Sequence, residues 1–199
     1  MPETPVPLPV VSGERTEFGF TRTRCGCPSC SVSCRFVPGF LVPADLQRLA
    51  EAAGVWGRPV PLVLWAEQHL LASPGAVVGV QTDAGVKTVR VPTLVPARQA
   101  DGMACHWLAA DGRCEVHANS PYGCAFCDSH MGRAAGQARS LAGIRAVATA
   151  WADGGVYGTI WTVLRDSGLV APGPDASRAK MAEAIGTPHP VNTPYPENP

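Results

Sequence analysis

The sequence predicts an α+β domain that is mostly α-helical, carries a small β-hairpin and is organised by a metal held in irregular cysteine-rich segments. Three observations lead to this prediction. Apolar residues recur at helical spacing, two β-rich segments flank a short turn, and all eight cysteines fall into two compact regions. A chain of 199 residues, 46% of them apolar, can bury an ordinary core, so it needs no covalent cross-links merely to fold.

Proline-rich segments flank the predicted domain. Residues 1–17 and 186–199 are expected to be extended tails, which leaves residues 18–185 as a single metal-binding domain. The first tail has no basic segment and no unbroken apolar one, so it does not resemble a signal peptide. The longest strongly apolar run, VPLVLWA, is far shorter than the roughly 20 residues that cross a bilayer. We therefore expect a cytoplasmic protein with no membrane partner.

The charge of the chain argues against nucleic acid as a partner. Acidic and basic residues number 16 each, and charged residues make up only 16% of the chain. Nucleic-acid-binding domains usually carry a strongly basic surface, whereas this chain has no run of lysine or arginine. The expected partner is thus a metal ion, and no motif names a protein partner.

Two helices are predicted between the cysteine regions. Residues 43–53 form the first, because Pro43 suits a first helical turn and Gly54 suits the residue after the last one. The segment 61–75 predicts the second, which we expect to end at its closing Ser-Pro-Gly. His69, on this second helix, is interpreted as a surface or core histidine.

A hairpin and three further helices complete the predicted elements. The segments AVVGVQT and VKTVRVPTLV are β-rich and flank Asp83-Ala84-Gly85, which indicates a hairpin, with Pro92 expected to end the second strand or confine it to an edge. Residues 131–155, 155–169 and 175–186 predict helices. Three aromatic residues at helical spacing are interpreted as core, not as a cofactor site: Trp151, Tyr157 and Trp161.

The cysteines carry the only strong chemical signal. The first cluster, C-x-C-x2-C-x3-C, consists of Cys25, Cys27, Cys30 and Cys34. The second, C-x8-C-x9-C-x2-C, consists of Cys105, Cys114, Cys124 and Cys127. In a reducing compartment such thiols indicate metal rather than disulfides, and each Cys-x2-Cys pair brings two thiolates to one ion. All eight are therefore predicted metal ligands.

Zinc and an iron–sulfur cluster both fit these ligands. The Cys-x2-Cys pairs favour zinc, as does a histidine in place of a thiolate, for which His106, His117 and His130 are candidates. All-cysteine ligation and apolar flanks favour an iron–sulfur cluster, which could be shielded by Phe36, Trp107 and Phe126. Redox chemistry of the thioredoxin kind is the competing interpretation, but it requires one Cys-x2-Cys that opens a helix after a strand.

Two segments resemble a known family. FLVPADLQRLA and ACHWLAADGRCEVHANSPYGCAF are similar to the CxxCxxCC-type cysteine-cluster family of zinc- or iron-chelating domains, over about half the chain, residues 25–131. The family's second pattern falls here on Cys105, Leu108, Gly112, Cys114, Val116, Pro121 and Cys124. The adjacent Cys-Cys pair of its first cluster is missing. The resemblance implies a bound metal, and because some relatives are associated with flagellin lysine methylation, it also implies an alternative function as an enzyme or enzyme subunit in protein lysine methylation.

The leading prediction is a metal centre that joins residues 25–34 to residues 105–127. Closing a connection of about 70 residues costs only a few kcal/mol of chain entropy. A structural zinc site contributes on the order of 10 kcal/mol in small domains, so the centre can hold the two regions together. We expect a structural or electron-transfer role. The catalytic residues of any enzyme function are unknown, since neither G-x-x-x-x-G-K-[ST] nor H-E-x-x-H occurs.

Overall fold

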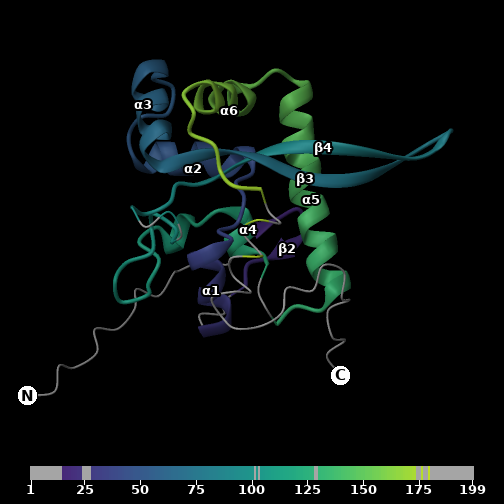
Figure 1. Cartoon of the computed structure of the whole chain (residues 1–199), viewed down its shortest axis with the longest axis horizontal. Coiled ribbons are helices and arrows are strands. Elements are labelled where there is room, and N and C mark those ends of the chain that lie inside the picture. The colour runs from purple at the N-terminus through teal and green to yellow at the C-terminus, as the bar shows by residue number, and fades with distance from the viewer. Residues whose placement is uncertain are drawn as a thin grey trace, which may run out of the picture.

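The computed structural model describes residues 15–23, 28–100, 102, 104–127, 130–173, 176 and 179. Figure 1 shows its elements in space. In chain order they are β1 (Thr16–Glu17), β2 (Phe20–Thr21), α1 (Pro28–Phe36), α2 (Pro43–Ala52), α3 (Pro59–His69), β3 (Leu70–Thr82), β4 (Gly85–Pro96), the 3-10 turn η1 (His117–Asn119), α4 (Tyr122–Ala125), α5 (Arg133–Ala152) and α6 (Val156–Asp166). Nearly all of the helix predicted at 175–186 lies outside the described residues. The whole C-terminal tail lies outside them too.

The prediction of a mostly helical domain is wrong. The described part of the chain is 44% helical and 23% strand, which makes the fold a mixed α+β class. Most of the additional strand lies in the hairpin, whose strands β3 and β4 are 13 and 12 residues long and pair antiparallel. The short pair β1–β2 forms the second two-stranded sheet. It includes residues 16 and 17, at the end of the predicted N-terminal tail.

A β-bulge explains why the hairpin is longer than predicted. The helix α3 ends at His69, and the residues expected to continue it already belong to β3. Pairing shifts register between Ser73 and Ala76. Between them Gly75 has φ +77°, and a Cβ there would lie 1.9 Å from the carbonyl oxygen of Val91. Ser-Pro-Gly therefore bends a strand here instead of ending a helix.

Pro92 lies opposite this bulge. Thr93 pairs with Ser73, and the next pair along the strands is Val91 with Ala76. Pro92 therefore has no regularly paired residue opposite it on β3. A proline is tolerated there because it has no N–H to donate. Its carbonyl accepts a hydrogen bond from Trp151 Nε1 at 3.0 Å. Of the two predicted effects of Pro92, ending the strand is wrong, because β4 continues to Pro96; confinement to an edge holds, because the sheet has only the two strands β3 and β4.

The base of the hairpin is the centre of the core. Tyr157 on α6 is fully buried, and its hydroxyl accepts a hydrogen bond from the N–H of Leu94 (2.8 Å) and donates one to the carbonyl of Leu41 (2.7 Å). Trp161 donates from Nε1 to the carbonyl of Ser73 (2.9 Å). Trp151 and Trp161 meet edge to face with ring centroids 5.3 Å apart. The predicted core role of the three aromatic residues is confirmed.

The helices cover only the base of the hairpin. In Figure 1 the turn end of β3–β4 extends beyond α5 and α6, while α1, α4 and β2 lie on the other side of the hairpin from α6. The longest helix, α5, carries Arg133, Arg139 and Arg145 among its alanines. No helix in the described part of the chain has both the length and the apolar character needed to cross a membrane.

Candidate metal centre

The first cysteine region is helical where it is described. The helix α1 begins at Pro28 and contains Cys30 and Cys34, whereas Cys25 and Cys27 lie outside the described residues. The carbonyl of Cys34 accepts a hydrogen bond from the N–H of Cys105 at 2.7 Å. This bond joins the end of α1 to the segment after β4. The two cysteine regions, predicted to meet, are thus in direct backbone contact.

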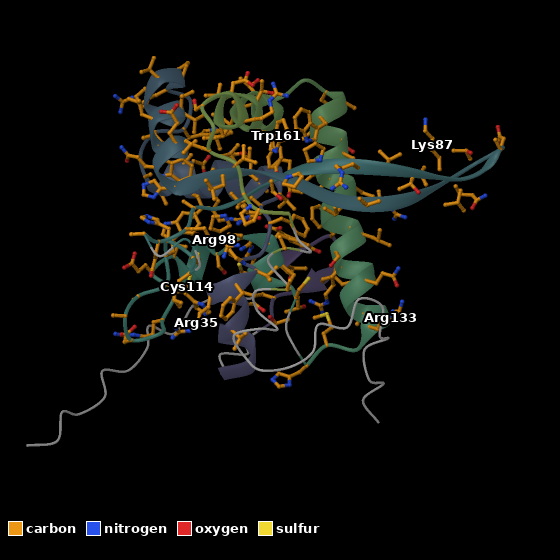
Figure 2. All side chains as sticks on the ribbon, viewed as in Figure 1. Arg35, Lys87, Arg98, Cys114, Arg133 and Trp161 are labelled. Atoms are coloured by element: carbon orange, nitrogen blue, oxygen red, sulfur yellow. The ribbon has the colours of Figure 1, made fainter. Side chains whose placement is uncertain are left out.

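A tight loop returns Cys114 to the neighbourhood of Cys105. Leu108 forms a β-bridge with Cys114, and the N–H of Leu108 donates to the carbonyl of Cys105 at 3.0 Å. The turn between them has Gly112 at φ +83°, a left-handed conformation that glycine adopts without strain. The backbone N–H of Arg113 donates to Asp111 Oδ1 at 3.0 Å. In Figure 2 Cys114 lies on this loop, below Arg98 and above Arg35.

Two glycines place Cys124 against the end of α1. A Cβ on Gly39 would lie 2.1 Å from the carbonyl carbon of Gly123, so the two backbones approach as closely as only glycine permits. The N–H of Gly123 donates to the carbonyl of Phe40 at 3.0 Å. The N–H of Gly39 donates to Cys124 Sγ at 3.2 Å. An amide aimed at sulfur stabilises a thiolate, as it does in metal–sulfur sites.

We expect Gly39→Ala to displace Cys124. Because the three atoms nearest to the new methyl group all belong to the backbone of Gly123 and Cys124, relief requires moving the chain. We expect a loss of roughly 3 kcal/mol or more from overpacking. Gly132→Ala is the matched control, since a Cβ there meets no atom within 4 Å. Thermal melting of the two variants checks the expectation, and equal melting temperatures would contradict it.

Four thiols influence one another's ionisation. Burial is the largest cause in each case: it raises the pKa of Cys105 to about 12, and it raises those of Cys114 and Cys124. The charge of Cys34 contributes to all three shifts, and the charges of Cys105 and Cys114 contribute to that of Cys124. Arg22 acts in the opposite direction on Cys114. The structure therefore gathers Cys34, Cys105, Cys114 and Cys124, while Cys127 Sγ lies 3.8 Å from Ser140 Oγ on α5.

The sulfur atoms of these described cysteines do not converge on a single metal position. Within the described ranges of the chain, no group of three or more His, Cys, Asp or Glu side chains is arranged to hold a metal ion. Cys105, Cys114 and Cys124 are free thiols there. The arrangement thus has the donor chemistry of a soft-metal site, with Cys105 buried and Cys34, Cys114 and Cys124 half-buried.

A buried carboxylate, that of Asp45 near the start of α2, supports this region. Asp45 is fully buried, and its Oδ2 accepts hydrogen bonds from the N–H groups of Val42 (2.9 Å) and Tyr122 (2.6 Å). Arg48 donates to Oδ1 at 2.9 Å, and Arg15 pairs with the same oxygen. Burial, the largest cause, raises the pKa of Asp45 to about 6, although Arg15 and the two N–H groups lower it. Asp45 thereby fixes Tyr122, two residues before Cys124.

A pair of histidines is a feature that sequence analysis missed. His69 Nδ1 lies 3.0 Å from His106 Nε2. Burial, and secondarily the charge of His106, lowers the pKa of His69. Helical periodicity placed His69 correctly on a helix, but no local signal connects it with a residue 37 positions later.

Among the depressions on the surface, the one beside α6 has no catalytic character. It has a volume of about 420 Å³ and is formed between the end of α5 and α6. Its lining consists of Trp151, Gly154, Gly155, Gly158, Thr159, Thr162 and Val163. None of these side chains is an acid or base at neutral pH, so this depression offers no support for an enzyme.

The comparisons with known proteins found no match. No family model matches the chain, and neither a curated protein nor a solved structure is detectably similar to it. The resemblance to the cysteine-cluster family therefore stays a prediction from the residues.

Proposed function

We propose that this protein is a metal-binding module whose centre is held by Cys34, Cys105, Cys114 and Cys124, and that the metal is zinc or an iron–sulfur cluster. One observation carries the proposal: besides burial, Cys34, Cys105 and Cys114, which come from both cysteine regions, all contribute to the raised pKa of Cys124. Mutual repulsion and desolvation penalise thiolates in the metal-free state, and a bound cation removes both penalties. Because the described thiols do not converge on one point, binding requires their side chains to move toward the ion.

The role of the centre is structural or electron transfer. Its ligands come from α1, the loop after β4 and α4, so the metal joins segments that are far apart in the sequence. The Gly39 N–H directed at Cys124 supports either metal. We place the protein in the cytoplasm, where thiols stay reduced. The other predicted ligands, Cys25, Cys27, Cys30 and Cys127, stay candidates for a second site.

Anaerobic purification of the full chain tests this proposal. With an iron–sulfur cluster the protein should be brown, absorb broadly near 400 nm (about the region of thiolate-ligated iron) and bleach on reduction. With zinc it should be colourless and contain zinc by plasma mass spectrometry. Protein that carries neither metal and binds neither on reconstitution would refute the proposal.

Metal binding should release protons and strengthen as pH rises. Cys105, Cys114 and Cys124 have pKa values raised above the ordinary thiol value, so at neutral pH each holds a proton that the metal must displace. We expect at least three protons released per metal ion. Calorimetric zinc titration in buffers of different ionisation enthalpy measures this number, and release of less than one proton would contradict the assignment of these ligands.

A further inference from the structure

The paired histidines are a second group of possible ligands that uses no cysteine side chain, although His106 directly follows Cys105 in the chain. His69 is the last residue of α3, and His106 lies in the loop after β4. The ring centroid of Trp65 lies 5.4 Å from that of His69, and the centroid of Trp107 lies 6.2 Å from those of both histidines. Both histidines are half-buried, with the indole of Trp65 near His69 and that of Trp107 near both rings.

One residue of the backbone holds both histidines in place. The N–H of Ala97 donates to the carbonyl of His69, and the carbonyl of Ala97 accepts from the N–H of His106, each at 2.8 Å. Ala97 directly follows β4, whose last residue, Pro96, pairs with Leu70. The two imidazoles therefore project from a backbone that is already fixed, which is the condition for a pre-organised ligand pair.

The separation of the two nitrogens matches that of neighbouring metal ligands. They lie 3.0 Å apart, while the ring centroids are 4.9 Å apart and the ring planes are tilted by 56°. The rings thus meet at an angle instead of head on. Two metal–imidazole bonds of about 2.1 Å at a right angle place their nitrogens about 3 Å apart. Right-angle geometry belongs to octahedral and tetragonal ions, and imidazole suits Ni²⁺ and Cu²⁺.

We propose that His69 Nδ1 and His106 Nε2 bind a divalent transition-metal ion that prefers right-angle ligands, Ni²⁺ or Cu²⁺, with water in the other positions. In the metal-free pair, one of the two facing nitrogens carries a proton and donates a hydrogen bond to the other nitrogen. On binding, that proton moves to the far nitrogen of the same ring, so both facing lone pairs become available and the net charge of the pair is unchanged. The site uses no cysteine and therefore does not depend on the proposed function.

The test titrates Ni²⁺ into the full chain carrying the metal it is purified with. We choose Ni²⁺ as the probe because it does not oxidise thiols. His69→Asn and His106→Gln replace each facing nitrogen by a side-chain amide that can keep the hydrogen bond but is a poor nickel ligand. We expect one Ni²⁺ to bind the parent protein, and each variant to bind it at least about tenfold more weakly, or roughly 1.4 kcal/mol. Gln68→Ala, exposed on α3, is the control and should bind like the parent protein.

Two further measurements separate this site from the cysteines. The purified metal content should be the same in both histidine variants, whereas loss of that metal during the titration would show Ni²⁺ entering the cysteine site. In the parent protein, bound Ni²⁺ should broaden the indole NMR signals of Trp65 and Trp107 and spare those of Trp151 and Trp161. Absence of Ni²⁺ binding, unchanged binding in both variants, or broadening of the other pair of indoles would each overturn the proposal.

Discussion

Replacement of Cys124 by serine is expected to remove the metal and loosen the domain. Desolvation and three neighbouring cysteines raise the pKa of its thiol, and its sulfur accepts a backbone N–H, so it lies at the centre of the gathered group. A serine hydroxyl is a poor ligand for the metals that thiolates bind. We expect the loss to include several kcal/mol of folding energy, because ligands contributed by separate segments make metal binding part of folding. A loss of about 4 kcal/mol would lower the melting temperature by roughly 8–16 °C.

The matched comparison is Cys127→Ser, which removes a thiol beside Ser140 on α5. Metal content and thermal melting should change less than in Cys124→Ser if the four-thiol group forms one site. Complete chelation of the parent protein should reproduce the Cys124→Ser phenotype. An unchanged circular dichroism spectrum and melting curve after chelation would show that the metal does not join the two regions.

Local signals predicted those elements whose ends are determined locally. The helix α2 ends within one residue of the prediction, because its proline start and glycine stop act within the helix itself. Ser73-Pro74-Gly75, by contrast, suits either a helix end or a bulge. The carbonyl of Val91 decides between them, and it lies 16 residues further along the chain than Gly75.

The candidate metal centre, too, was predictable from the sequence only in part. The clustering of cysteines indicated that the two regions meet, and the Cys105–Cys34 backbone bond agrees. Which sulfurs gather depends on the contact between Gly39 and Gly123, and no pattern within either segment reveals that contact. The same applies to Asp45, whose partner Tyr122 lies 77 residues away. Long-range partners of this kind follow from the packing of elements, not from their periodicity.

Replacement of Asp45 by alanine is expected to be the most damaging change away from the cysteines. The buried carboxylate satisfies two backbone N–H groups and two arginines, and Arg15 and Arg48 also share Glu17. Without Asp45, the N–H of Tyr122 and the guanidinium of Arg15 lose a buried acceptor. Removing one member of a buried ion pair costs about 3–5 kcal/mol, so melting should fall by roughly 6–20 °C.

The effect should reach the metal, since Tyr122 opens the short helix that carries Cys124. We therefore expect Asp45→Ala to weaken metal binding although Asp45 is not a ligand. Asp45→Asn keeps one oxygen for a backbone N–H and loses the charge, so its melting temperature should lie between those of the alanine variant and the parent. Asp166→Ala is the control, because Asp166 is exposed at the end of α6 and pairs with its neighbour Arg165. Equal stability and equal metal affinity of Asp45→Ala and Asp166→Ala would show that the buried carboxylate does not position Cys124.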